Sequence, residues 1–389
     1  MKSAIYLDNN ATTFVDSRIA DRVHELSRQN VANSGSQHAS GRRALKLLEE
    51  AKAELLSLSG ADFHGMDAYL PLITSGGTEA NNLALLGLGV AKPGILVAAA
   101  TEHPSVSEAA KYAAAFGCQL RVLPVDQQGA CDVNTLETWL KRDATRITLV
   151  SVMLGNNETG VIQDLETICA LCRNYEVPVH SDAVQAIGKI PVALRELGLS
   201  AMTITAHKIH GPVGIGALIV DKSLGLKPQL HGGGQQLGLR PGTEPVIPTV
   251  ALSLAVRYTC ESREQGDYER IAEYRDSFEA EVCRMTGAEV IAGTAPRLPH
   301  TSNLAFPNID RQALQMALDL QGVACSTGSA CSSGSSRPSA VLVAMGLGEH
   351  LVANSLRFSF SRNTTQEEAV EAAEIVARTA NKLQMHSTP

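Results

Sequence analysis

Apolar segments alternate with helix-like segments over the first two thirds of this chain. The apolar runs, each about the length of one strand, fall within residues 94–103, 146–153, 177–184, 201–208 and 215–221. Amphipathic segments of helical length occupy residues 105–117 and 164–176. Strands separated by helices form βαβ units, and strands buried on both faces show continuous apolar runs. Because such crossovers are right-handed, the pattern predicts an α/β fold with a doubly wound, mostly parallel sheet.

The pattern changes from about Ser262 onward. We expect a long charged helix, a strand, a helix, a half-buried strand and a capped final helix over residues 263–285, 300–307, 311–322, 355–362 and 365–383. At 389 residues the chain is longer than one ordinary domain. We expect an N-terminal segment, residues 1–15, that packs with the small domain. A large α/β domain should span residues 16–258. A small α+β domain should span residues 259–389 and carry a loop at about 322–338.

Composition and charge narrow the class of protein. The net charge of −7 disfavours direct nucleic-acid binding, which needs a basic surface. No apolar run is long enough to cross a membrane, and the first residues lack a secretory signal pattern. Eight cysteines in a long chain without such a signal predict a reduced, cytoplasmic protein. Cys169 and Cys172 lack a second cysteine pair, so we expect core packing there and no metal site.

Polar clusters lie at the ends of five apolar runs: the first four runs given above and the one that ends at Ile73. They read "TSGGTE", "TEH", "GNNETG", "HSDAVQ" and "TAHKIHGPVG". Parallel sheets bind ligands beyond the carboxyl ends of their strands, so we expect a site where these clusters meet. In "TSGGTE", Gly76 and Gly77 precede a helix that we expect to open at Thr78 or Glu79, and a helix N-terminus favours a phosphate group. An ordinary capped turn between strand and helix is the alternative.

Asp182 and Lys208 each come directly after an apolar strand. A carboxylate in such surroundings needs a cation or donors, and a protonated pyridine ring is a suitable partner. A poorly solvated lysine has a lowered pKa and can form a Schiff base. The alternatives are a helix N-cap for Asp182 and a surface position for Lys208. Together with the phosphate loop, the two residues predict pyridoxal 5′-phosphate (PLP) as the cofactor.

Two further side chains suit the same chemistry. His103 in "TEH" follows another strand, and a flat imidazole there can stack on a cofactor ring and move protons. Arg357 in "SLRFSFSR" lies within a strand of the small domain, where its planar guanidinium can bind a substrate carboxylate. Arg362 competes for that role, and a purely structural role is the alternative for each of these residues.

Nine motifs in order along nearly the whole chain resemble those of the cysteine desulfurases, enzymes of the class V aminotransferase group with the type I PLP fold. They are "YLDNNATT", "TSGGTEANN", "TEH", "NNETGVIQDL", "HSDAVQAIGK", "AHKIHGPVGIGAL", "HGGGQQLGLRPGT", "GSACSSGSSRPS" and "LRFSFSRNTT". Ser34, Pro241 and Ser361 depart from the commoner family pattern, which puts fine geometry and partner surfaces in question rather than the reaction.

The resemblance implies a role for each matching position. Lys208 would hold PLP as a Schiff base, Asp182 would bond the pyridinium nitrogen, and His103 would stack over the ring. Gln185 would bind the ring hydroxyl. The phosphate would be bound by residues of the same chain and by Thr243 from the second subunit of a homodimer; those of the same chain are Gly77, Thr78, Thr205 and His207. The carboxylate of the substrate, L-cysteine, would be held by Asn157 and Arg357.

Cys331 lies in the Ser- and Gly-rich tract "GVACSTGSACSSGSSRPS". The resemblance implies that its thiolate takes the substrate sulfur, leaving L-alanine and a persulfide that passes to a sulfur-acceptor or scaffold protein. A flexible tether suits both collection and delivery of sulfur. Cys325 is the competing nucleophile, and the family motif favours Cys331. A dispensable linker cysteine is the alternative.

Other functions remain open at this point. A selenocysteine lyase, an aminotransferase or a kynureninase-like enzyme would keep the fold and change the substrate. A catalytically inactive scaffold that docks sulfur-transfer partners is a rival of another class. The acceptor pathway is also open among iron–sulfur cluster assembly, tRNA thiolation and a nitrogenase pathway.

Overall fold

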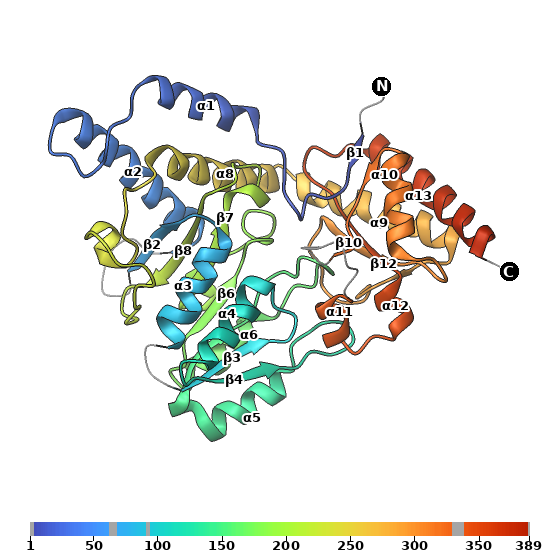
Figure 1. The fold of residues 1–389 in the computed structure, drawn as a ribbon, viewed down its shortest axis with the longest axis horizontal. Helices are drawn as coiled ribbons and strands as arrows, with labels where there is room; N and C mark the ends of the chain where they lie inside the picture. Colours follow the sequence, from blue (N-terminus) through green and yellow to red (C-terminus); the bar gives the residue numbers. More distant parts are fainter. Residues whose placement is uncertain (1–3, 62–67, 91–93, 329–337, 388–389) are drawn as a thin grey trace.

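The computed structural model describes residues 4–61, 68–90, 94–328 and 338–387 (Figure 1). Within these residues the largest sheet has seven strands in the order β2-β8-β7-β6-β5-β3-β4. Strand β8 runs antiparallel to β2 and β7, and the other neighbours are parallel. The strands are β2 (Tyr69–Thr74), β3 (Ile95–Ala99), β4 (Gln119–Leu123), β5 (Ile147–Ser151), β6 (Val179–Asp182), β7 (Ala201–Thr205) and β8 (Gly216–Asp221). The predicted α/β class with a mostly parallel sheet is confirmed.

Helices cover both faces of this sheet. Successive strand residues point to opposite faces, so Leu96 packs against the first group of helices while its neighbour Val97 packs on the other side. The first group is α3 (Gly77–Gly89) and α4 (Pro104–Ala114). The second face is covered by α1 (Ser17–Arg28), α2 (Ala39–Leu58), α5 (Val133–Asp143), α6 (Leu165–Arg173), α7 (Leu194–Leu197) and α8 (Val246–Glu264). Two-sided burial explains the continuous apolar runs.

A smaller α+β unit follows, on the right in Figure 1. Its three-stranded antiparallel sheet has the order β12-β10-β9 and packs on α9, α10 and α13. The strands are β9 (Glu289–Val290), β10 (Thr301–Ala305) and β12 (Ser355–Ser359), and the helices are α9 (Asp267–Thr286), α10 (Arg311–Leu320), α11 (Ala340–Ala344), α12 (Glu349–Ala353) and α13 (Gln366–Ser387). Short 3₁₀ turns occupy Ala144–Arg146, Ala206–Lys208 and Gln235–Gly238. None of the helices in the described ranges is long and apolar enough to cross a membrane.

The N-terminal segment joins the two units. Strand β1 (Ile5–Tyr6) pairs in parallel with β11 (Val323–Ala324) of the smaller unit. A few residues later, Thr13 N–H donates to the His207 carbonyl of the larger unit at 2.9 Å. The segment therefore contacts both units. The boundaries at residues 15 and 258 stay a prediction.

Two sequence-based expectations were wrong. Strand β12 is buried at all five positions, not half-buried. Leu356 and Phe358 pack into the hydrophobic cluster of the smaller unit, whereas Arg357 and Ser359 contact the N-terminal segment instead of water. The long charged helix is also interrupted: α8 ends at Glu264 and α9 begins after Gly266, whose φ of 83° lies in the left-handed region that ends helices.

Candidate active site

Most of the predicted site residues meet in one pocket of about 260 Å³. The pocket lies beyond the carboxyl ends of β6 and β7, as expected for a parallel sheet. Residues that the sequence singled out and that line it are Gly77, Thr78, His103, Asn157, Asp182, Gln185, Thr205, His207 and Lys208. The lining is completed by Asn81, Ser105, Met153 and Val184.

A glycine turn brings the N-terminus of α3 to the pocket. Strand β2 ends at Thr74 and α3 begins at Gly77, one residue before the earliest predicted start. Gly77 packs closely against the opposite wall, since a Cβ there would lie 3.2 Å from Val184 Cγ2. Free N–H groups at this end of a 13-residue helix form a cradle that suits a phosphate group.

Asp182 is the last residue of β6 and is only 5% exposed. Its carboxylate accepts hydrogen bonds from Asn81 Nδ2 at 2.7 Å and from the Val184 N–H at 3.0 Å. Residues 184–189 form turns, so Asp182 does not cap a helix. Both donors are neutral, and a buried carboxylate with neutral donors is well placed to bind a cationic ring.

Lys208 closes the 3₁₀ turn that follows β7. Its Nζ donates to the carbonyl oxygens of Asn10 at 2.6 Å and Ala11 at 2.7 Å. Burial, and then the charge of Arg357, lower the pKa of this amine to about 8. An amine with this pKa is partly neutral near physiological pH and can act as a nucleophile or a base.

Two histidines of the pocket are held neutral. His103 caps α4, and its Nδ1 accepts from the Ser105 N–H at 3.1 Å and lies 2.7 Å from Ser105 Oγ. Burial lowers the pKa of His103. Burial, and then the Lys208 charge, lower the pKa of His207 to about 4. A neutral imidazole can stack on an aromatic ring without adding charge to the pocket.

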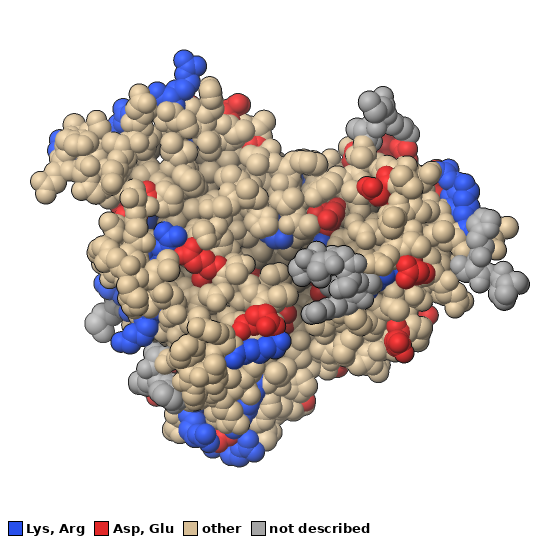
Figure 2. Space-filling view, in the orientation of Figure 1, with Lys and Arg blue, Asp and Glu red and all other residues tan. Residues whose placement is uncertain are grey.

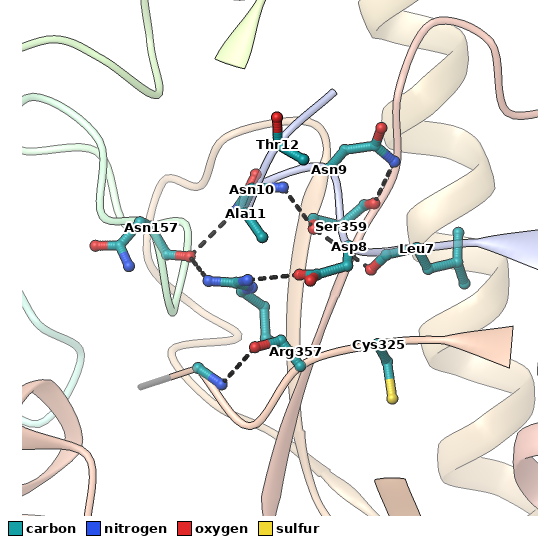
Figure 3. A network of polar contacts seen from close by, with 12 residues as sticks. Leu7, Asp8, Asn9, Asn10, Ala11, Thr12, Asn157, Cys325, Arg357 and Ser359 are labelled. Carbon is teal, nitrogen blue, oxygen red and sulfur yellow. Dashed lines mark hydrogen bonds and ion pairs between the residues drawn. The ribbon is translucent and has the colours of Figure 1, made fainter. Parts of the chain in front are cut away.

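Arg357 is not part of the pocket lining but contacts the lining residue Asn157 (Figure 3). Its guanidinium donates to the Asn157 carbonyl at 3.0 Å and pairs with Asp8 at 2.6 Å. A substrate carboxylate would therefore meet a guanidinium that Asp8 already contacts. The competing Arg362 pairs with Asp16 and donates to the Tyr258 carbonyl, so its guanidinium serves the contact between the two units.

Three cysteine predictions have different outcomes. Cys331 lies outside the described residues. Cys325 is buried, and burial raises its thiol pKa to about 12, which makes a thiolate unfavourable. Cys169 and Cys172 both pack in the main hydrophobic cluster of the larger unit, as expected for core residues.

Glu158 contacts the chain on both sides of residues 329–337. Ser339 Oγ donates to Glu158 Oε2 at 2.6 Å. On the other side, a Cβ at Gly328 would lie only 2.8 Å from the same oxygen, and Gly328 has a φ of 84°. Gly328 and Ser339, which flank the segment that carries Cys331, therefore both lie next to Glu158, the neighbour of Asn157 in the chain.

Thr243 is exposed and does not line the pocket. Thr243 therefore does not contribute to the pocket of its own chain, and the contact from a second subunit stays a prediction.

On the face shown in Figure 2, basic and acidic side chains are interspersed, without one large basic area.

Sequence reasoning did not single out Asn81, Ser105, Asp8 or Asn10. Asn81 follows Gly77 by four residues within "TSGGTEANN", and this helical spacing places it on the same side of α3. This four-residue spacing could have identified Asn81 as a site residue from the sequence. Asn10 meets Lys208 across 198 residues of chain, and no local pattern encodes such a contact.

Together these groups fit PLP. The α3 N-terminus suits the phosphate, Asp182 suits the ring nitrogen, and Lys208 suits the aldehyde carbon. Of the residues that the structure describes, no group of three or more His, Cys, Asp or Glu could hold a metal ion.

A pocket of this kind on a sheet of this topology defines an enzyme of the type I PLP fold. The aminotransferase class-V family matches residues 5–372, and the chain belongs to that family. The cysteine desulfurase IscS of Dictyoglomus turgidum is 34% identical over 387 residues, which cover 98% of this chain and 96% of that protein. The cysteine desulfurase NifS of Azotobacter vinelandii is 34% identical over 367 residues, with 94% and 89% covered. The crystal structure of a NifS-like protein from Rickettsia africae is 32% identical, covers 97% and 99% of the two chains, and has a TM-score of 0.87.

Proposed function

We propose that this protein is a cysteine desulfurase that uses PLP to remove sulfur from L-cysteine. The products are L-alanine and a persulfide on Cys331. The observation that carries the proposal is the meeting of Lys208, whose pKa is about 8, and the buried Asp182 carboxylate in one pocket. Relatives that bear this name and match almost the whole chain support it.

PLP, when bound, supplies an electron sink for the charge that develops at the substrate Cα. Asp182 keeps the ring nitrogen protonated, and Asn81 holds the carboxylate in place. Arg357 orients the substrate carboxylate next to Asn157. Lys208 removes the Cα proton, since its lowered pKa leaves part of the amine neutral and able to accept a proton. His103, neutral and close to the ring site, can move a second proton.

Sulfur transfer needs a thiolate that can accept the substrate sulfur. The Cys331 Sγ forms a bond to the substrate sulfur while the substrate C–S bond breaks, and the electron pair of that bond stays with the carbon. Protonation of the carbon gives alanine, and Cys331 keeps the sulfur as a persulfide. The raised pKa of the buried Cys325 supports the choice of Cys331. An acceptor or scaffold protein then takes the sulfur, in iron–sulfur cluster assembly or thiolation.

The proposal includes a homodimer and a cytoplasmic location. The exposed position of Thr243 outside its own pocket supports a contact from a second subunit. The seven cysteines within the described ranges are free thiols, which fits a reducing compartment.

A visible absorption spectrum and a product assay test the proposal. We expect the purified protein to bind PLP with a visible band that Lys208→Ala changes. With L-cysteine, the wild-type protein and Cys325→Ala should form alanine and persulfide, and Cys331→Ala should not. If Cys331→Ala keeps its activity, or if only selenocysteine reacts, a selenocysteine lyase or another class V enzyme replaces the proposal. A protein without a PLP band would instead be a scaffold.

A further inference from the structure

Lys189 is a buried amine next to the pocket, and the proposed mechanism does not use it. The residue lies in the turns after β6 and is only 4% exposed. Its Nζ lies 3.3 Å from Gln185 Oε1 and 3.1 Å from His300 Nε2. Both partners are neutral groups: an amide, and an imidazole whose pKa burial lowers. Because a lysine without a charged partner is rarely buried, this position calls for a role.

The two partners connect Lys189 with both units of the protein. Gln185 lines the PLP pocket, and its Nε2 donates to the Asn10 carbonyl at 3.1 Å. The same carbonyl accepts from Lys208 Nζ at 2.6 Å. His300 precedes β10 of the smaller unit, and its ring packs edge-on against Tyr268. Lys189 therefore joins the wall of the pocket to the smaller unit.

Hydrogen-bond chemistry fixes which end of the Gln185 amide faces Lys189. A protonated Lys189 has only donors, so it must meet the amide oxygen. A neutral Lys189 can accept one hydrogen bond from His300 and still donates to Gln185. In both states Nε2 must face the Asn10 carbonyl, which only accepts, so Oε1 points to Lys189 and the Nε2 group lies toward the pocket.

We propose that Lys189 is a positioning residue of the cofactor site. It holds the Gln185 amide so that an N–H donor, rather than a carbonyl oxygen, faces the pocket. The bound group must then present an acceptor oxygen at this wall, as the ring oxygen of PLP does. The inference rests on the proposed function, because it assumes that PLP is the bound group.

The charge around Lys189 supports this role. Burial, and then the Lys208 charge, lower the pKa of Lys189 to about 7. Lys208, His300 and Gln185 face it, and His300 in turn lies near the positive Arg275. Conversion between the charged and neutral forms leaves the bond to Gln185 in place, so the amide keeps its orientation around neutral pH.

The test is Lys189→Met, which keeps the length of the side chain and removes the donor. Without the Lys189 donor, only the bond to the Asn10 carbonyl holds the amide, so its N–H is less firmly fixed toward the cofactor. We expect roughly tenfold weaker PLP binding by the apoprotein, the size of one lost hydrogen bond. We also expect the pH midpoint of the visible band of the PLP-bound protein to rise, because a donor to the ring oxygen is no longer enforced. Lys141→Met removes a surface positive charge and should change neither quantity.

A double-mutant cycle separates positioning from general packing. Gln185→Leu alone should weaken PLP binding, and Lys189→Met should then add no further effect, because the amide that it orients is gone. Additive effects, or an unchanged midpoint in Lys189→Met, would overturn the inference. If Lys189→Met does not fold, Lys189→Gln keeps a donor and serves in the same cycle, with a partial effect expected. A wild-type protein without a PLP band contradicts the proposed function itself, whereas a normal band that Lys189→Met leaves unchanged contradicts only the inference.

Discussion

At the scale of single residues, the amine of Lys208 is subject to opposing influences. Its bonds to the carbonyl oxygens of Asn10 and Ala11 favour the charged form, whereas burial and the Arg357 charge favour the neutral form. The balance lowers the pKa from 10.5 to about 8. Lys208 should therefore react with electrophiles at a pH where surface lysines such as Lys141 are still protonated.

Labelling of the apoprotein with an acylating reagent tests this expectation. Because the neutral amine is the reactive form, labelling of Lys208 should rise with pH to a midpoint near 8, the value of its pKa. The bond to Glu137 raises the pKa of Lys141, so this lysine should be labelled only at higher pH. Mass spectrometry after brief labelling measures both sites in one sample. Equal midpoints would contradict the prediction.

Arg357→Lys tests the proposed binding of the substrate carboxylate. A lysine keeps the charge but loses the planar pair of donors, so we expect KM for L-cysteine to rise about 10- to 100-fold. Steady-state kinetics measures the change. Arg362→Lys serves as the control and should leave KM within about twofold, since Arg362 bonds Asp16 and the Tyr258 carbonyl instead. The reverse pattern would assign carboxylate binding to Arg362.

At this scale, the site residues that could be predicted from the sequence are those marked by a local pattern. Lys208, Asp182 and His103 could be predicted because each lies at or just after the end of an apolar strand, where a parallel sheet binds its ligands. Asp8, which pairs with Arg357, could not be predicted. Its partner lies 349 residues away, and that contact is set by the packing of the N-terminal segment against β12.

At the scale of elements, β8 supports the glycine turn that opens the pocket. A Cβ at Gly216, the first residue of β8, would lie 2.8 Å from the backbone carbon of Gly76. Gly76 directly precedes α3, so any side chain at Gly216 pushes the proposed phosphate cradle away from its position.

We expect Gly216→Ala to destabilise the protein by about 1–3 kcal/mol, the usual cost of overpacking, and to weaken PLP binding. Thermal unfolding of the apoprotein and the PLP dissociation constant measure the two effects. Gly225→Ala is the matched control, because a Cβ at Gly225 meets no atom within 4 Å. Similar losses in both variants would show that the loss of glycine, not the close approach to Gly76, is responsible.

Strands were easier to predict than the exposure of their faces. Leu96 and Val97 belong to hydrophobic clusters on opposite sides of the large sheet, so β3 has the continuous apolar run that indicates two-sided burial. The same logic failed for β12, whose polar positions suggested water. Arg357 and Ser359 instead contact other polar groups of the protein, and a single sequence does not distinguish buried polar partners from solvent.

At the scale of the whole molecule, an ion pair joins the smaller unit to the start of the larger one. Arg362 follows β12, and Asp16 caps α1. Both side chains are largely buried, at 7% and 12% exposure. Asp16 also bonds Arg18 at 2.7 Å, so its carboxylate keeps one partner when Arg362 is removed.

Arg362→Leu should lower the free energy of unfolding by about 3 kcal/mol, as expected when one partner of a buried pair is lost. Arg284→Leu removes an exposed pair with Glu281 and should leave the free energy of unfolding almost unchanged, because surface ion pairs are screened by solvent. The bond from Arg18 and the charge of Arg362 lower the pKa of Asp16, so its contribution is present above the unfolded pKa and is lost as pH falls through the folded one. Denaturant unfolding at neutral and acidic pH should therefore show a smaller Arg362→Leu effect in acid.

Glu158 has a consequence for how the length of the cysteine-bearing segment can vary. Because Gly328 and Ser339 both contact its carboxylate, the two ends of residues 329–337 are fixed close together by the fold. The entropic cost of closing a loop grows only with the logarithm of its length, so doubling the length costs about 0.6 kcal/mol. Insertions between Gly328 and Ser339 should therefore leave the free energy of unfolding almost unchanged, which denaturant unfolding can measure.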